Sequence, residues 1–157
     1  ENTTSLYKGS RDIIWSLNAQ NDGIYEIAEH IKSIGTELFS ETHIDFDYHH
    51  NIEKNSSVKL QLDFSRNLTM IFKEAYNNIL KHSNAEKVMV EVKLGPGLEM
   101  NITVRDNGTG FDTSAVHNGN GLRNIENRVT RLNGKLTIQS GEGIGTHLNI
   151  LLKATPI

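Results

Sequence analysis

The sequence VRDNGTGF at residues 104–111 joins an alternating segment to a turn with two glycines. Apolar and polar residues alternate over residues 100–105, which predicts a β-strand that stops at Asp106. Gly108 and Gly110 tolerate backbone angles that a side chain forbids, and they let a flat ligand approach the main chain. A carboxylate beside bare backbone can accept a hydrogen bond from the exocyclic amine of a purine. Asp-Asn-Gly is also common in ordinary turns, so this stretch alone leaves both interpretations open.

The composition is that of a globular chain of about one domain. The 157 residues are 36% hydrophobic and 22% charged, which excludes extended disorder. The net charge of −3 argues against nucleic-acid binding, because there is no basic excess to neutralise phosphates. Cysteine is absent, which excludes disulfides and thiol chemistry, and no apolar run approaches the ~20 residues of a membrane span. Because the chain begins at Glu1 rather than Met, we expect a fragment of a larger protein.

Hydrophobic periodicity predicts both helices and strands. Helical spacing predicts helices at residues 5–18, 24–39, 63–83 and 122–132. Alternation predicts strands at residues 44–48, 58–62, 87–94, 100–106, 135–139 and 146–153. We expect the first two strands to pair in antiparallel fashion, because only a polar, turn-like stretch separates them. The predicted fold class is α+β, a two-layer α/β sandwich with helices on one face of a mostly antiparallel or mixed sheet and an N-terminal helical extension.

The helix predicted at residues 63–83 carries a polar edge beside its apolar stripe. Glu74, Asn78 and Lys81 are spaced four and three residues apart and therefore point the same way, with His82 at the boundary. Asn78 offers an oxygen to Mg²⁺, and Glu74 could orient one of its waters. Lys81 could meet a phosphate as a point charge. A solvated ladder of surface side chains has the same spacing, so the helix alone does not decide between the two.

Two more glycine-rich stretches flank the last predicted helix. Gly119 and Gly121 precede it, where free backbone amides and the helix dipole favour an anion. Gly143 and Gly145 precede Thr146 and would let its hydroxyl approach the same loop. A flexible loop and a long hairpin turn explain these glycines equally well when each stretch is taken alone.

Taken in order, the four motifs resemble a known family. They are Glu74-x3-Asn78, Asp106-x-Gly108-x-Gly110, Gly119-x-Gly121 and Gly143-x-Gly145-Thr146. Together they look like the N, G1 and G2 boxes and the final Gly-x-Gly-Thr of the ATP-binding catalytic domain of sensor histidine kinases. That domain belongs to the wider group that includes gyrase, heat-shock-90 and MutL ATPases. The resemblance covers residues 44–153, and residues 72–82 and 121–128 are similar to its short-lid, nitrate-sensor-like subfamily.

The resemblance implies a division of the chain and a role for each motif. Residues 1–22 would be the end of the dimerisation and phosphoacceptor helix, 23–42 a linker helix and 43–157 the ATP-binding catalytic domain. Asp106 would accept from the adenine amine, and Asn78 would ligate Mg²⁺ with Glu74 close to its waters. The implied nucleotide contacts come from the remaining motif residues, namely Gly108 and Gly110 around the base and Lys81, His82, Gly119, Gly121, Leu122 and Thr146 towards the phosphates. Residues 111–120 would be a short mobile lid.

The implied reaction is transfer of the γ-phosphoryl group of ATP to a histidine. No phosphoacceptor His-box occurs among these residues, so the acceptor histidine is expected on a dimerisation domain outside the fragment. The implied partners are that domain and a response regulator, within a homodimeric, membrane-anchored bacterial sensor whose kinase part is cytoplasmic. Two alternatives share the nucleotide fold: an anti-sigma-type serine kinase and an ATP-gated module without phosphotransfer.

Overall fold

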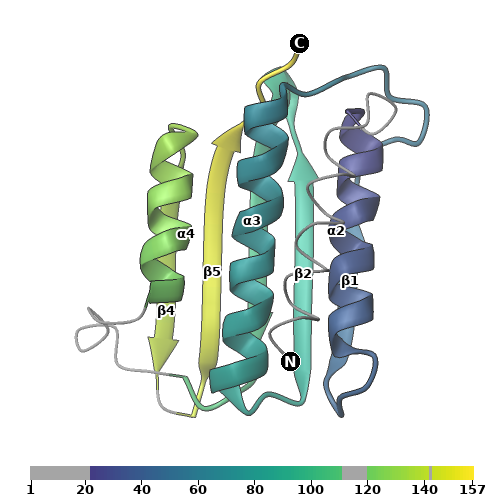
Figure 1. Ribbon diagram of the computed structural model, residues 1–157. Helices are drawn as coiled ribbons and strands as arrows, with labels where there is room; N and C mark the ends of the chain where they lie inside the picture. Colours follow the sequence, from purple (N-terminus) through teal and green to yellow (C-terminus); the bar gives the residue numbers. More distant parts are fainter. Residues whose placement is uncertain (1–21, 111–119, 142) are drawn as a thin grey trace, which may run out of the picture.

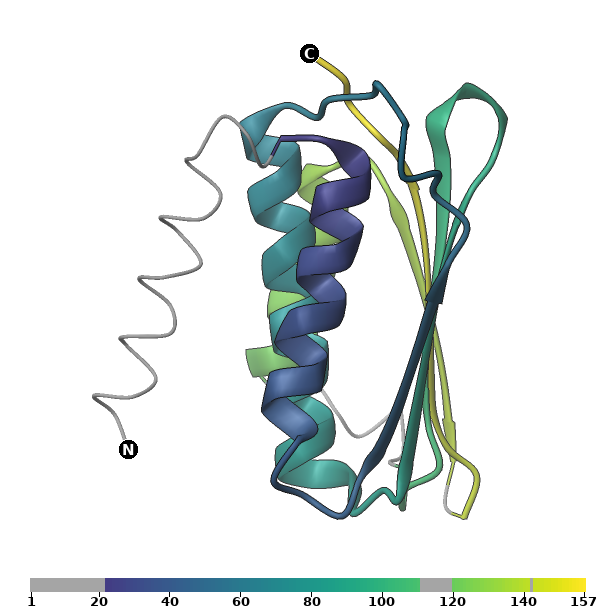
Figure 2. The same cartoon turned by 90° about the vertical axis from the view of Figure 1, so that its right-hand side faces the viewer.

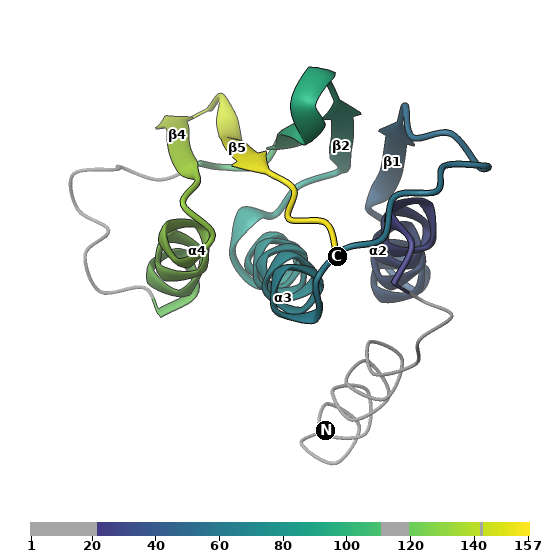
Figure 3. The ribbon, with the colours of Figure 1, turned by 90° about the horizontal axis from the view of Figure 1, so that it is seen from above.

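The computed structural model describes residues 22–110, 120–141 and 143–157, which form one sheet covered on one face by helices. The strands are β1 (Asp45–His50), β2 (Lys87–Leu94), β3 (Glu99–Asp106), β4 (Lys135–Gly141) and β5 (Gly145–Lys153). The helices are α2 (Ile24–Phe39), α3 (Leu62–Asn78) and α4 (Asn120–Arg131) (Figure 1). The sheet order is β1-β2-β3-β5-β4, and all three helices lie on the same face (Figures 2 and 3). The predicted α+β two-layer sandwich is confirmed.

Alternation of burial along the central strands β2 and β3 positions the core between the layers. Alternate residues of β2 and β3, including Val88, Val90, Ile102 and Val104, are buried, and their neighbours face away from the helices. The helices contribute mainly large apolar side chains such as Phe72. Burial of one helix stripe against one sheet face is the physical basis of the two layers.

Helix α2 packs as a full member of the helical layer. The buried Tyr48 hydroxyl of β1 donates to the Ala28 carbonyl at 2.7 Å. The Tyr76 hydroxyl of α3 donates to the Ile31 carbonyl at 3.3 Å. Gly35 allows close approach of α2 to β1, because a Cβ there would lie 2.2 Å from the Phe46 ring. Whether this helix also serves as a linker to a stalk stays a prediction.

The predicted antiparallel pairing of residues 44–48 with 58–62 is wrong. Strand β1 pairs with β2 in parallel. Helix α3 lies between the two strands in sequence and returns the chain to the end of the sheet at which β1 begins. Residues 58–60 contribute only the isolated bridges Gly23↔Lys59 and Leu60↔Pro156. A five-residue alternation predicts a strand but does not identify its partner.

The bounds of α2 match the predicted helix at residues 24–39, whereas the C-terminal end of α3 differs from the prediction of a helix at 63–83. Beyond Asn78 the chain continues as a π-helix, Ile79–Ser83, where a continuous α-helix was predicted. π-Helical segments are rare, and those that occur are often found at functional sites. The helix predicted at residues 5–18 lies outside the described residues.

Candidate functional site

A row of side chains crosses four strands at the end of the sandwich where β3 stops. The strand registers place Val88, Asp106, Thr146 and Ser140 in line across β2, β3, β5 and β4. The inward-facing residues of these strands continue into this row, so its side chains face the helical layer. This is the lower end in Figure 1, opposite the C-terminus.

Asp106 is a buried carboxylate whose oxygen is held by the loop that follows it. Only 7% of the residue is exposed, and its Oδ1 accepts the Gly108 backbone N–H at 2.9 Å. Burial raises the pKa of Asp106 above its usual value of 3.8, while the backbone N–H groups of Gly108 and Thr146 and the nearby His147 act in the opposite direction. The carboxylate is thus a poorly solvated acceptor that a hydrogen-bond donor from a ligand would stabilise.

The loop after Asp106 is fastened to the elements beside it. The Asn107 side-chain oxygen accepts from the backbone N–H groups of Glu86 and Lys87, each at 2.9 Å. The Thr109 N–H donates to the Ser83 carbonyl at 2.7 Å. A Cβ on Gly108 would lie 2.0 Å from the Ser83 carbonyl oxygen, so glycine is required for this close approach. The loop therefore packs directly on the π-helix that follows Asn78.

The other side of the loop contacts the β4–β5 hairpin. A Cβ on Gly110 would lie 2.2 Å from the Gly141 carbonyl oxygen, and one on Gly145 would lie 2.1 Å from the Asp106 carbonyl oxygen. At Gly145 the φ of 84° also disfavours any side chain. Two of the glycine motifs identified in the sequence thus pack against each other around Asp106.

Ser140 is a residue of the site that the sequence motifs did not predict, and its hydroxyl contacts that of Thr146. The two hydroxyl oxygens are 2.9 Å apart, and the Ser140 hydroxyl also donates to the Gly145 carbonyl at 3.1 Å. The sequence contained a weak signal for this pair. The two residues lie symmetrically about Gly143, the centre of the hairpin turn, and are therefore opposite each other in the ladder.

Asn78 lies where the end of α3 meets the start of α4. A Cβ on Gly121 would lie 2.3 Å from the Asn78 amide oxygen, so the two residues are in direct contact. Glu74 lies one turn earlier on α3, and both it and Asn78 are half-buried. Among the described residues, no three His, Asp or Glu side chains gather as a metal cage. The donor set fits a Mg²⁺ ion that takes one amide oxygen from the protein and its other ligands from water and phosphate.

Lys81 and His82 are carried by the π-helix and are exposed. The prediction that Lys81 and Asn78 point the same way assumed α-helical geometry. Because Lys81 lies in the wider π-helix, the three-residue spacing no longer supports that prediction. Leu122 is half-buried and packs against the core. Gly119 and the predicted lid at 111–120 lie outside the described residues, apart from the backbone of residue 120.

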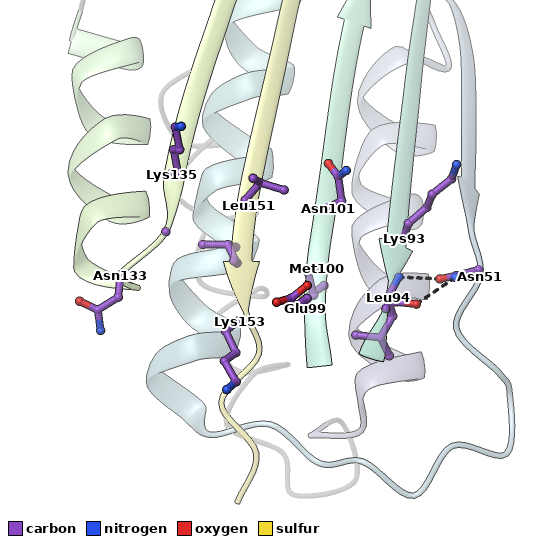
Figure 4. A pocket seen from close by; sticks show the side chains of 13 residues that line it. Asn51, Lys93, Leu94, Glu99, Met100, Asn101, Asn133, Lys135, Leu151 and Lys153 are labelled. Carbon is purple, nitrogen blue, oxygen red and sulfur yellow. Dashed lines mark hydrogen bonds between the residues drawn. The ribbon is translucent and has the colours of Figure 1, made fainter. Parts of the chain in front are cut away.

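The structure brings the two ends of the predicted site to one end of the sandwich. Gly108, two residues after Asp106, contacts Ser83, five residues after Asn78. A separate pocket on the outer sheet face lies at the opposite end, lined by Lys93, Asn101, Lys135 and others (Figure 4). It contains none of the predicted site residues.

A family model matches residues 63–156, which include every described site residue. Its description is histidine kinase-, DNA gyrase B-, and HSP90-like ATPase. In the described part of the chain, no helix has the length and apolarity needed to cross a bilayer.

Curated relatives include the histidine-protein kinase/phosphatase DegS of Bacillus subtilis, 32% identical over 103 residues, covering 63% of this chain and 26% of DegS. The nitrate/nitrite sensor protein NarQ of Escherichia coli is 30% identical over 115 residues, covering 66% of this chain and 20% of NarQ. The chain thus spans about a fifth to a quarter of the length of these relatives.

Solved histidine kinase domains share the fold. One from Erythrobacter litoralis superposes with a TM-score of 0.68 at 18% identity, covering 81% of this chain and 60% of that chain. The catalytic domain of the histidine kinase ThkA gives 0.67 at 14% identity, covering 86% and 96% respectively.

Proposed function

The chain belongs to the histidine kinase-, DNA gyrase B- and HSP90-like ATPase family, and from this premise we propose that it is the catalytic domain of a two-component sensor histidine kinase. In this proposal, the domain binds ATP and transfers the γ-phosphoryl group to a histidine on a dimerisation domain of the same parent protein. The similarity to DegS and NarQ, both named as sensors or histidine kinases, supports this assignment. Partners are then the phosphoacceptor domain and a response regulator, in a cytoplasmic part of a dimeric, membrane-anchored sensor.

Asp106 binds the base in this proposal. Its buried carboxylate, which the backbone N–H groups of Gly108 and Thr146 approach, would also accept from the adenine amine. The family resemblance implied a phosphate contact for Thr146, but its pairing with Asp106 across β3 and β5 favours a place beside the base instead. Gly110 and Gly145 allow the loop and hairpin to close around this point without side chains in the way.

Asn78 and the start of α4 hold the phosphates. ATP supplies the transferable phosphoryl group, and cations at the site would neutralise the negative charge that develops on the leaving oxygen of ADP. Asn78 would contribute an amide oxygen to Mg²⁺, and Glu74 would orient a water on that ion. The backbone amides of Gly121 and Leu122 lie in the first turn of α4, where helix N–H groups lack intrahelical partners and favour an anion. Lys81, His82 and Gly119 complete the charge and hydrogen-bond donors on the phosphate side.

One observation carries the proposal: the loop after Asp106 is packed on the same helical segment that carries Asn78, so an acceptor for the base and a ligand for the metal lie at one end of the sandwich. The roles follow from this placement together with family membership.

The test is a phosphotransfer assay with the acceptor supplied separately. The 157-residue chain is incubated with γ-labelled ATP, Mg²⁺ and a dimerisation domain from a related short-lid kinase. Acid-labile, base-stable phosphate on the acceptor histidine is the expected result, and a histidine-to-glutamine acceptor is the control. Acid-stable phosphoserine on an added partner would identify a serine kinase. Tight ATP binding with no transfer to any acceptor would favour an ATP-gated module.

A further inference from the structure

We propose that Ser140 is a positioning residue that fixes the direction of the Thr146 hydroxyl proton and thereby sharpens the selection of adenine. This inference rests on the proposed nucleotide site and extends it to a residue on β4. Ser140 does not reach the base itself in this proposal; it acts through Thr146.

The hydrogen bonds of the hairpin assign the proton. A serine hydroxyl has one proton to donate and lone pairs with which to accept. The Ser140 hydroxyl donates to the Gly145 carbonyl oxygen at 3.1 Å, an atom that can only accept. With the Ser140 proton on that carbonyl, Thr146 is the donor and Ser140 the acceptor in the 2.9 Å contact between the two hydroxyls.

This leaves Thr146 with only lone pairs to offer towards the site. Asp106, the partner of Thr146 across β3 and β5, is also an acceptor, since its Oδ1 accepts the Gly108 backbone N–H at 2.9 Å. The base site thus presents two acceptors side by side on one cross-strand row.

Two acceptors select a particular edge of a purine. The adenine amine carries two N–H groups and can donate to both, whereas the carbonyl oxygen at the same position of hypoxanthine can only accept. A Thr146 hydroxyl free to rotate could turn its proton towards that carbonyl. By engaging the proton, Ser140 removes this alternative, so the carbonyl of hypoxanthine faces an acceptor and is disfavoured.

The strand register makes the arrangement rigid. Ser140 and Thr146 are directly paired in the β4–β5 ladder, on the side facing the helices. Both residues are half-buried, and Gly145 between them is buried. The distance between the hydroxyls is therefore set by the sheet rather than by a mobile loop.

The experiment compares ATP with inosine triphosphate. The inosine base has a carbonyl in place of the adenine amine and, unlike guanine, has no 2-amino group. Dissociation constants of the 157-residue chain for the two nucleotides are measured by calorimetry with Mg²⁺. Ser140→Ala is expected to reduce the preference for ATP by about three- to tenfold, the range for one neutral hydrogen bond. Ser140→Thr, which keeps the hydroxyl on a β-branched side chain suited to a strand, is expected to retain the preference.

A double-mutant cycle separates positioning from a structural role. Thr146→Val removes the hydroxyl while keeping the shape, and in that background Ser140→Ala is expected to change the preference no further. Thr137→Ala, which removes a hydroxyl from an exposed position of the same strand, is the matched control. Should Ser140→Ala fail to fold, Ser140→Cys keeps the side-chain size with weak hydrogen bonding and is expected to show the same loss.

The outcomes are distinct for the inference and for the proposed function. A wild-type chain that binds neither nucleotide contradicts the nucleotide site itself. A wild-type chain that prefers ATP, with a folded Ser140→Ala variant of unchanged preference, overturns the role of Ser140 alone. An equal loss in the wild-type and Thr146→Val backgrounds also overturns it, because Ser140 would then act independently of Thr146.

Discussion

Replacing Asp106 by Asn tests the base site with the smallest change of shape. The Asn oxygen can take the place of Oδ1 and accept the Gly108 N–H, now made at 2.9 Å. The amide nitrogen then occupies the other carboxylate position, where it donates instead of accepting. It faces both the Thr146 backbone N–H, which interacts with the carboxylate, and the amine of a bound adenine.

The expected result is weaker ATP binding by about 1–3 kcal/mol, the range for a hydrogen bond lost at a buried charged group. This corresponds to a roughly five- to 150-fold higher dissociation constant. Calorimetric titration of the chain with ATP and Mg²⁺ measures it directly. Binding of inorganic triphosphate, which has no base, is expected to be unchanged by the substitution.

Asp63→Asn is the matched control. It makes the same charge change in the first turn of α3, at the end of that helix farthest from Asn78. Asp63 is exposed and pairs with exposed Arg131 at 3.1 Å, a contact of small energetic value. Unchanged ATP affinity in Asp106→Asn, with native melting behaviour, would refute the assignment of Asp106 to the base. An equal loss in Asp63→Asn would point to long-range charge instead of a direct contact.

Three further predictions concern the metal, the start of α4 and pH. Asn78→Ala is expected to abolish the effect of Mg²⁺ on ATP affinity, measured by titration with and without the ion, whereas Asn77→Ala should leave that effect intact. Gly121→Ala is expected to weaken ATP binding several-fold without lowering the melting temperature, because the new Cβ would displace the Asn78 amide while alanine favours the helix; Gly95→Ala, whose Cβ would have no neighbour nearer than 3.8 Å, is the control. Because burial raises the folded-state pKa of Asp106, the contribution of this carboxyl to stability is full below about pH 3.8 and is lost as pH rises through the folded-state pKa. Chemical denaturation at several pH values gives the slope of the unfolding free energy against pH, and the part of that slope due to Asp106 should vanish in Asp106→Asn.

The sequence predicted those parts of the fold whose signal is local. Alternation over residues 100–105 and the glycine at Gly108 predicted that the strand stops at the Asp106 carboxylate, and the structure confirms that β3 ends there. The apolar period of α3 and the hairpin of β4 and β5 were equally local. In each case one short window contains the pattern and its boundary.

The misses are one pairing of distant strands, one local change of helix geometry and one contact across a hairpin. The parallel pairing of β1 with β2 depends on the path of α3, which the alternation of five residues does not encode. The π-helix at Ile79–Ser83 is followed by Asn84 in a left-handed conformation with φ of 50°, a change of geometry that helical spacing alone cannot detect. Ser140 was missed because its importance comes from the residue opposite, and register is fixed only when the hairpin closes.

The glycines show how structure changes the meaning of a correct motif. From sequence, Gly108 was expected to let a ligand approach the main chain, yet the space beside it is filled by the Ser83 carbonyl of the protein itself. An alanine there would push the loop away from the π-helix and move Asp106 relative to Asn78. The motif therefore fixes the distance between Asp106 and Asn78. A nucleotide that contacts both residues binds best when that distance is set before the nucleotide arrives. On this argument, Gly108→Ala should weaken ATP and inosine triphosphate equally, whereas loss of Ser140 should affect their ratio; a change in the ratio with Gly108→Ala would mean that Gly108 contacts the base after all.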